Sequence, residues 1–250
     1  MERAIATPTE NKEPLREMSF YDHLDDLRKV IVQSAVALLA AMIVCWFFSG
    51  RILEFLISPF PVDNLVFTDP IEAFMVRVRI SVVGALMIAF PFVLFRIWAF
   101  VAPGLFANER KKILPFVVGS SALFYGGVVF CFVVLIPIVL DFLMGFKTPR
   151  LEPMISVNSY FAFVARLCFA FGVVFQLPIV VLVLSVLGIV TPAWLLRQWR
   201  YGILGIAVAA AVFTPPDVIS MIAMGVPLIV LYAASVALAF VIVRKKAPRD

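Results

Sequence analysis

The chain has 250 residues, of which 63% are hydrophobic and 15% are charged, and its formal net charge is +5. Soluble domains carry about a quarter charged residues, so this composition excludes an ordinary soluble domain and indicates an integral membrane protein. The apolar residues form long uninterrupted runs, which favours an all-α protein with transmembrane helices over a transmembrane barrel.

The first apolar run follows a polar N-terminal segment, residues 1–29. We expect this run to remain as a span, because no small-residue cleavage site follows it. Since a span needs about 20 apolar residues, the sequence predicts one polytopic membrane domain, 1–250, with six transmembrane helices. The predicted spans are about 30–48, 78–101, 115–138, 161–187, 200–213 and 218–243.

The fifth predicted span is short. From Tyr201 to Phe213 it has 13 residues, which cover about 20 Å of a hydrocarbon core about 30 Å thick. Two outcomes are open at this stage. The helix either lengthens backward through residues 193–200, with Arg197 and Arg200 extending to the surface, or the bilayer thins around it.

The basic residues predict the orientation. Fifteen of the 21 Lys and Arg residues fall on the side that holds both termini, with Arg96 counted in the loop after the second span. Because cytoplasmic loops carry the excess of Lys and Arg, we expect both termini and Glu109 to face the cytoplasm. The longer loops on the opposite side, 49–77 and 139–160, contain prolines and are expected to be ordered caps.

A proline and a glutamine in the fourth span, and a proline-rich motif after the fifth, predict particular local structures. Pro178 has no N–H to donate to the carbonyl of Val174, so a kink is predicted there. Gln176 lies near the middle of the same span and needs a hydrogen-bond partner in hydrocarbon, either in this chain or in a partner subunit. The motif "FTPPD" (213–217) is expected to be a tight hairpin in which Asp217 caps the sixth span.

The three cysteines and the single histidine bear on redox and metal chemistry. Cys45, Cys131 and Cys168 lie within apolar runs and are expected to be buried, unpaired thiols. One histidine, His23, and three scattered cysteines cannot assemble a metal cluster, so no cofactor is expected.

The 16 acidic residues are placed unevenly, and none lies between Pro153 and Pro216. Ion-coupled transporters place Asp or Glu inside their spans, so this distribution disfavours ordinary ion-coupled transport. The cytoplasmic side keeps Asp25 and Asp26 before the first span, and Glu109 before a basic cluster. These carboxylates are either solvated surface charges or a binding site for arginines, since a carboxylate–Arg pair forms two parallel bonds that Lys cannot reproduce.

Five motifs in this order resemble one known family. They are "HLDDLRK" (23–29), "WAFVAPGLFANERK" (98–111), "FGVVFQLP" (171–178), "RQWRY" (197–201) and "FTPPD" (213–217). On a six-span plan they resemble the TatC family, the multispanning core subunit of the twin-arginine protein translocase, over about residues 18 to 243.

The resemblance implies a function in protein transport at the bacterial cytoplasmic (inner) membrane. A member of this family binds the twin-arginine signal peptide of a folded cargo protein and recruits single-span subunits of the TatA/TatB type. The assembly then moves the cargo across the membrane with the proton-motive force. The implied partners are therefore signal peptides, these subunits, membrane lipids and further copies of this chain in a larger complex, with no nucleic acid.

The resemblance also implies site residues. The signal-binding residues of the family fall on Asp26, Arg28, Phe100, Pro103 and Glu109, with Asp26 where the family often has Glu. The partner-binding residues fall on Gln176, Pro178 and Asp217. Gln176 stands where the family often has Glu, so it can form hydrogen bonds but cannot titrate, and a proton switch at this position is not expected.

Two other functions compete with this interpretation. The alternative is a polytopic transporter of an unknown solute. An intramembrane enzyme is disfavoured because the sequence has no HExxH, no GxSxG, no paired intramembrane aspartates and no second histidine. We therefore expect no catalytic residues.

Overall fold

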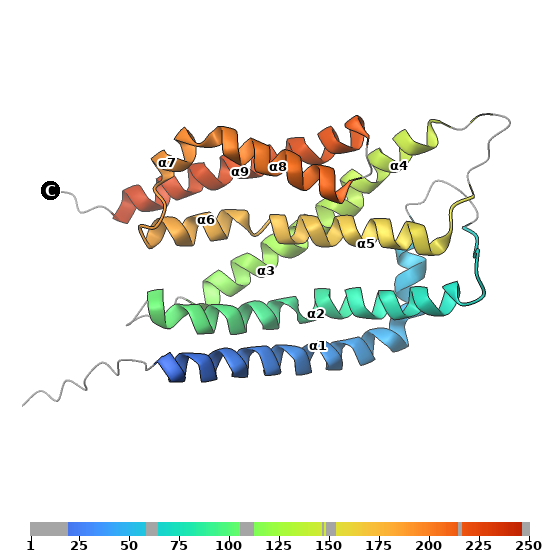
Figure 1. Ribbon diagram of the computed structural model, residues 1–250, viewed down its shortest axis with the longest axis horizontal. Helices are drawn as coiled ribbons and strands as arrows, with labels where there is room; N and C mark the ends of the chain where they lie inside the picture. Colours follow the sequence, from blue (N-terminus) through green and yellow to red (C-terminus); the bar gives the residue numbers. More distant parts are fainter. Residues whose placement is uncertain are drawn as a thin grey trace, which may run out of the picture.

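The computed structural model describes residues 20–58, 65–105, 113–146, 148, 154–214 and 217–246, and these ranges are almost entirely helical (Figure 1). In chain order the elements are α1 (Phe20–Ile57), α2 (Glu72–Leu105), α3 (Ile113–Phe130), the π-helical segment η2 (Cys131–Leu135), α4 (Ile136–Met144), α5 (Val157–Val174), α6 (Leu177–Val186), α7 (Pro192–Arg197), α8 (Trp199–Phe213) and α9 (Val218–Lys246).

Five helical stretches of the described chain are long and apolar enough to cross a membrane, and a sixth is shorter. The five are α1, α2, α3 continued through η2 and α4, α5 continued through α6, and α9. The sixth is α8, whose 15 residues extend about 22 Å, less than the hydrocarbon core. The prediction of six helical spans with a short fifth is therefore confirmed.

The backward extension of the fifth span does not occur as one helix. Residues 192–197 form the separate short helix α7, which begins where the Thr191 side chain accepts a hydrogen bond from the N–H of Trp194 at 3.2 Å. Gln198 has φ −96° and ψ 21°, outside the helical region, and separates α7 from α8. Arg197 thus ends α7 and does not lengthen the span.

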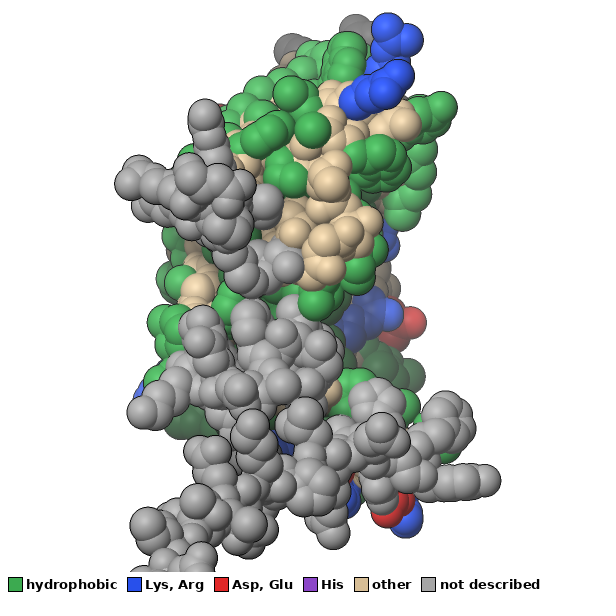
Figure 2. All heavy atoms as spheres, turned by 90° about the vertical axis from the view of Figure 1, so that its left-hand side faces the viewer, with side chains coloured by type: hydrophobic (Ala, Val, Ile, Leu, Met, Phe, Trp, Pro, Cys, Tyr) green, Lys and Arg blue, Asp and Glu red, His purple; other side chains and the backbone are tan. Residues whose placement is uncertain are grey.

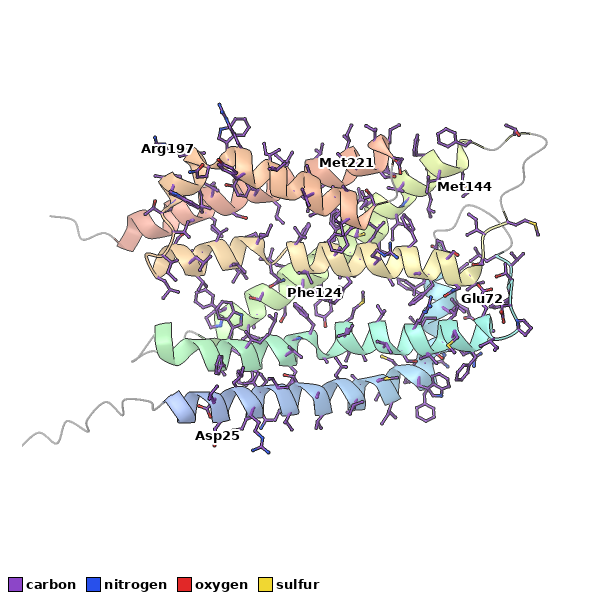
Figure 3. The ribbon with its side chains drawn as sticks, viewed as in Figure 1. Asp25, Glu72, Phe124, Met144, Arg197 and Met221 are labelled. Carbon is purple, nitrogen blue, oxygen red and sulfur yellow. The ribbon has the colours of Figure 1, made fainter. Side chains whose placement is uncertain are left out.

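Both ends of the described chain lie at one end of the molecule. The start of α1 and the end of α9 are at the left of Figure 1, and Figure 3 places Asp25 and Arg197 at this end. Glu72 and Met144 lie at the opposite end (Figure 3). We call these the inner and the outer end, following the predicted orientation. Arg96, counted with a loop above, lies within α2.

The core of the bundle lies where η2, α4, α5, α8 and α9 meet. Fully buried side chains there include Leu135, Leu167, Phe171 and Leu228. Many apolar side chains along the helices are exposed, as contact with lipid tails requires. Figure 2 looks onto the inner end, where hydrophobic side chains fill much of the upper part and Lys or Arg side chains lie at its edge. All three cysteines are buried and free, as predicted.

Prolines interrupt two of the spanning stretches. The predicted kink is present, because α5 ends at Val174 and α6 begins at Leu177, with Pro178 in the first turn of α6. A second interruption was not predicted. Pro137 cannot donate to a carbonyl one turn earlier, and the preceding turn widens into η2, where the N–H of Ile136 bonds the carbonyl of Cys131.

The described parts of the two outer loops contact one another, while residues 59–64 and 149–153 of the expected ordered caps lie outside the described residues. Val66 pairs with Ser156 in a short parallel bridge, with the N–H of Val157 donating to the carbonyl of Val66 at 3.1 Å. Glu72, at the start of α2, is buried and accepts bonds from the N–H of Thr68 at 2.6 Å and of Asn158 at 2.9 Å. The Glu72 carboxylate therefore joins the start of α2 to the first turn of α5.

Candidate functional site

The predicted signal-binding residues come from the inner ends of two adjacent helices. Asp26 and Arg28 lie in the second and third turns of α1, and Phe100 lies near the end of α2. α1 and α2 run antiparallel side by side, so their inner ends meet (Figure 1). Pro103 is also in α2, although its side chain is not among the described ones, and Glu109 lies outside the described residues.

Asp26 is an accessible carboxylate. Its side chain is 41% exposed and accepts a bond from the Lys29 ammonium at 3.0 Å, with Lys29 itself 62% exposed. Exposed pairs of this kind contribute about 0–1 kcal/mol. A guanidinium that bonds Asp26 through two N–H groups can therefore displace Lys29 at little cost.

Trp98 fixes the inner part of α2 against α3, a role that sequence reasoning missed. Its indole N–H donates to the Ser120 hydroxyl at 3.3 Å, and its ring lies 5.6 Å from that of Phe116. This contact holds α2 two residues before the half-buried Phe100. The signal was present in the sequence, since a tryptophan in a span near the interface needs a partner for its N–H.

The same stretch of α2 carries an incompletely paired cation. Arg96 is half-buried, and its Nε is buried without a hydrogen-bond partner among the described residues. It lies two residues before Trp98, so its guanidinium adds positive charge to the inner part of α2.

Gln176 bonds a neighbouring helix of its own chain. Its amide donates to the carbonyl of Ser120 at 2.9 Å, from the break between α5 and α6. Trp98 and Gln176 thus both bond Ser120, one through the hydroxyl and one through the carbonyl, which ties α2, α3 and α5 together. Of the two partners expected for Gln176, the intramolecular one is present. The Gln176 residue as a whole is half-buried.

Asp217 caps α9, as predicted. Its Oδ1 accepts a bond from the N–H of Ser220 at 2.6 Å, the geometry of an N-cap. Its Oδ2 and the Ser220 hydroxyl are both buried and have no hydrogen-bond partner among the described residues. The described structure does not bring Asp217 to Gln176 or Pro178 through a hydrogen bond, so these predicted partner-binding residues do not form one polar cluster.

The residues at the inner end are suited to binding a peptide. The described residues include no group of three or more His, Cys, Asp or Glu side chains that could hold a metal ion. What the inner end offers is an exposed carboxylate on α1 beside the aromatic end of α2, which is suited to a cationic, partly apolar peptide.

Comparisons with known proteins match this chain to one protein family. The family model for TatC, described as Sec-independent protein translocase protein, matches residues 22–227. The Sec-independent protein translocase protein TatC of Koribacter versatilis is 36% identical over 241 residues, covering 93% of this chain and 89% of that protein. The protein of the same description from Helicobacter pylori (strain J99) is 38% identical over 228 residues, covering 91% and 90%.

Solved structures give the same result. A crystal structure of the twin arginine translocase receptor TatC superposes with a TM-score of 0.79 at 32% identity, covering 88% of this chain and 98% of that one. A second crystal structure of that receptor, in DDM, gives a TM-score of 0.80 at 32% identity and covers 87% and 99%.

Proposed function

Because the chain belongs to the TatC family of Sec-independent protein translocase proteins, we propose that it binds the twin-arginine signal peptides of folded cargo at the cytoplasmic face of the inner membrane. The transport of an unknown solute is not favoured, because the relatives and solved structures are translocase proteins. They are also transport proteins rather than catalysts.

The exposed carboxylate of Asp26 carries the proposal. It is weakly held by Lys29 and lies on α1, at the end where the sequence of α2 contains Phe100 and Pro103. A signal arginine would form two parallel bonds with Asp26, while Glu109 would receive the second arginine. Arg28 and the ring of Phe100 would shape the remainder of the site.

Two separate positions on the bundle would recruit the partner subunits. We propose that Gln176, with the adjacent Pro178 kink, presents a polar group to the membrane helix of a TatA/TatB-type subunit, and that Asp217 orders the start of α9 at the outer end. The assembly would contain further copies of this chain and would be driven by the proton-motive force. Gln176 cannot titrate, so any proton step would belong to another chain.

A crosslinking experiment tests the signal site. A photoreactive twin-arginine peptide is presented to membranes that contain wild-type protein, Asp26→Ala, Glu109→Ala or the control Asp25→Ala. Asp25 is an exposed carboxylate next to Asp26 in α1, so its removal changes the net charge equally. We expect Asp26→Ala and Glu109→Ala to lose the crosslink while inserting normally. Equal crosslinking in all four proteins would refute the assignment.

A further inference from the structure

An apolar cavity lies between the outer halves of four helices. Its volume is about 330 Å³, at the lower end of the range of small-molecule pockets. The lining side chains come from α1, α2, α3 with η2, and α5, and include Phe55, Val83, Phe132 and Ala165. The rings of Phe55 and Phe132 stack at 5.1 Å and form one wall.

The lining of this cavity selects the chemistry of its occupant. Every lining residue is apolar, so a polar ligand would lose its hydrogen bonds to water without replacement. Among the described contacts, Tyr125 bonds the carbonyl of Met87 at 2.9 Å on the inner side of the cavity. An unbranched hydrocarbon chain, which forms no hydrogen bonds, fits this space.

The Arg79 guanidinium lies toward the outer end of the cavity. Arg79 lies one helical turn before Val83 on α2, and Asn158 lies one turn before Phe161 on α5, so both are above lining residues of the same faces. The exposed Arg79 guanidinium donates to the Asn158 side-chain carbonyl oxygen. That acceptor is neutral, and it uses only part of the five N–H donors of an arginine.

The neighbouring carboxylate is already engaged. Glu72 accepts hydrogen bonds from the backbone N–H groups of Asn158 and Thr68 and from the Thr68 hydroxyl. Among the described residues, Arg79 forms no ion pair with a carboxylate. Arg79 therefore has donors to offer an added anion. It lies at the outer limit of the predicted second span, from which a long arginine side chain can extend to the lipid phosphates.

We propose that this cavity is a binding site for one phospholipid of the outer leaflet, with an acyl chain between α1, α2, α3 and α5 and the phosphate on Arg79. The apolar lining accounts for the chain and the guanidinium for the phosphate, since Arg binds phosphate oxygens through paired N–H donors. The bound lipid would fill the space under the last turns of α1, which are linked to α5 by the Tyr160 hydroxyl and the Leu56 carbonyl at 2.7 Å.

Native mass spectrometry of the detergent-purified protein, titrated with dioleoyl phosphatidylglycerol, tests this site. We expect Arg79→Gln to weaken binding at least about tenfold, the loss of one charge-assisted contact. Ala165→Phe fills the cavity and should abolish binding with Arg79 still present. Arg77→Gln is the matched control. Arg77 is also exposed but lies on another face of α2, so the affinity of Arg77→Gln for the phospholipid should be unchanged.

Two further probes distinguish a phospholipid from free phosphate as the ligand of this site. Dioleoylglycerol has the chains without the phosphate, and inorganic phosphate has no chains. The proposal expects both to bind at least about tenfold more weakly than the phospholipid. Equal binding of inorganic phosphate, or equal losses in Arg77→Gln and Arg79→Gln, would overturn it.

A photolabelling measurement on the wild-type protein is independent of how any variant folds. A phospholipid with a diazirine on its acyl chain, in nanodiscs, should label peptides of α2 and α5 that line the cavity. Labelling confined to the outward-facing surface of α9, or labelling of the cavity by a twin-arginine peptide and not by the lipid, would contradict the proposal.

Discussion

Two adjacent glycines in α3, Gly126 and Gly127, provide a matched test of how the bundle is packed. A Cβ added at Gly126 would meet no atom within 4 Å. A Cβ at Gly127 would lie 2.7 Å from the carbonyl oxygen of Phe171 and 2.7 Å from the Cγ of Phe175. Carbon atoms in contact are normally about 3.5–4.0 Å apart, so α3 and α5 would have to separate by roughly 0.8 Å.

The two alanine variants should differ in stability by about 1–3 kcal/mol. Each gains up to ~1 kcal/mol from the higher helix propensity of alanine. Gly127→Ala in addition forces the backbone of α5 away, and overpacking of this kind costs about 1–3 kcal/mol. Gly126→Ala should therefore be neutral or stabilised, whereas Gly127→Ala should be neutral or destabilised.

Thermal unfolding of the detergent-purified variants, followed by circular dichroism, measures this difference. We expect Gly126→Ala to melt at a higher temperature than Gly127→Ala. Equal melting temperatures would mean that α3 and α5 are not in backbone contact at this level. In that case the bond between Gln176 and the Ser120 carbonyl would also be in doubt, because it needs α3 and α5 to lie close together.

Three other changes probe the polar contacts. Gln176→Leu removes one interhelical bond, worth on average ~0.6 kcal/mol in membrane proteins, so the melting temperature of this variant should barely change. Co-purification of a TatA/TatB-type subunit with it should fall. Unchanged co-purification would argue against partner docking at Gln176. Trp98→Phe should loosen α2 from α3 and increase hydrogen exchange at the end of α2, and unaltered exchange would exclude the anchoring role. Asp217→Ala should destabilise α9 by about 0.5–2 kcal/mol, with Asp217→Asn retaining most of the cap; equal losses in both would show that the charge matters and the cap does not.

Local chemistry was readable from the sequence wherever one residue determines the outcome. The missing N–H of Pro178 predicted the break between α5 and α6, and the carboxylate of Asp217 predicted the cap of α9. Pro137 follows the same physics, yet the sequence did not predict η2. A proline shows that the hydrogen-bond ladder is interrupted, whereas the way in which the helix closes around the interruption depends on packing against other helices.

Contacts between distant segments were not readable in this way. Gln176 clearly needed a partner, but Ser120 is 56 residues away in sequence and became identifiable only when α3 and α5 were placed side by side. Nothing in the sequence around Glu72 pointed to the bond that it accepts from the N–H of Asn158, 86 residues away. For the signal-binding site, the family motifs identified the candidate residues. The structure then showed that the Asp26 carboxylate is exposed and is paired only weakly with Lys29.

Selection of arginine over lysine is the central claim, and a direct affinity comparison tests it. A synthetic signal peptide with the Arg–Arg pair and the same peptide with Lys–Lys are titrated against the purified protein in nanodiscs. Both peptides carry the same charge, so simple attraction to an acidic rim cannot separate them. Two-bond pairing with carboxylates predicts that the Lys–Lys peptide binds at least about tenfold more weakly, a difference of ~1.4 kcal/mol. Equal affinity would contradict the account.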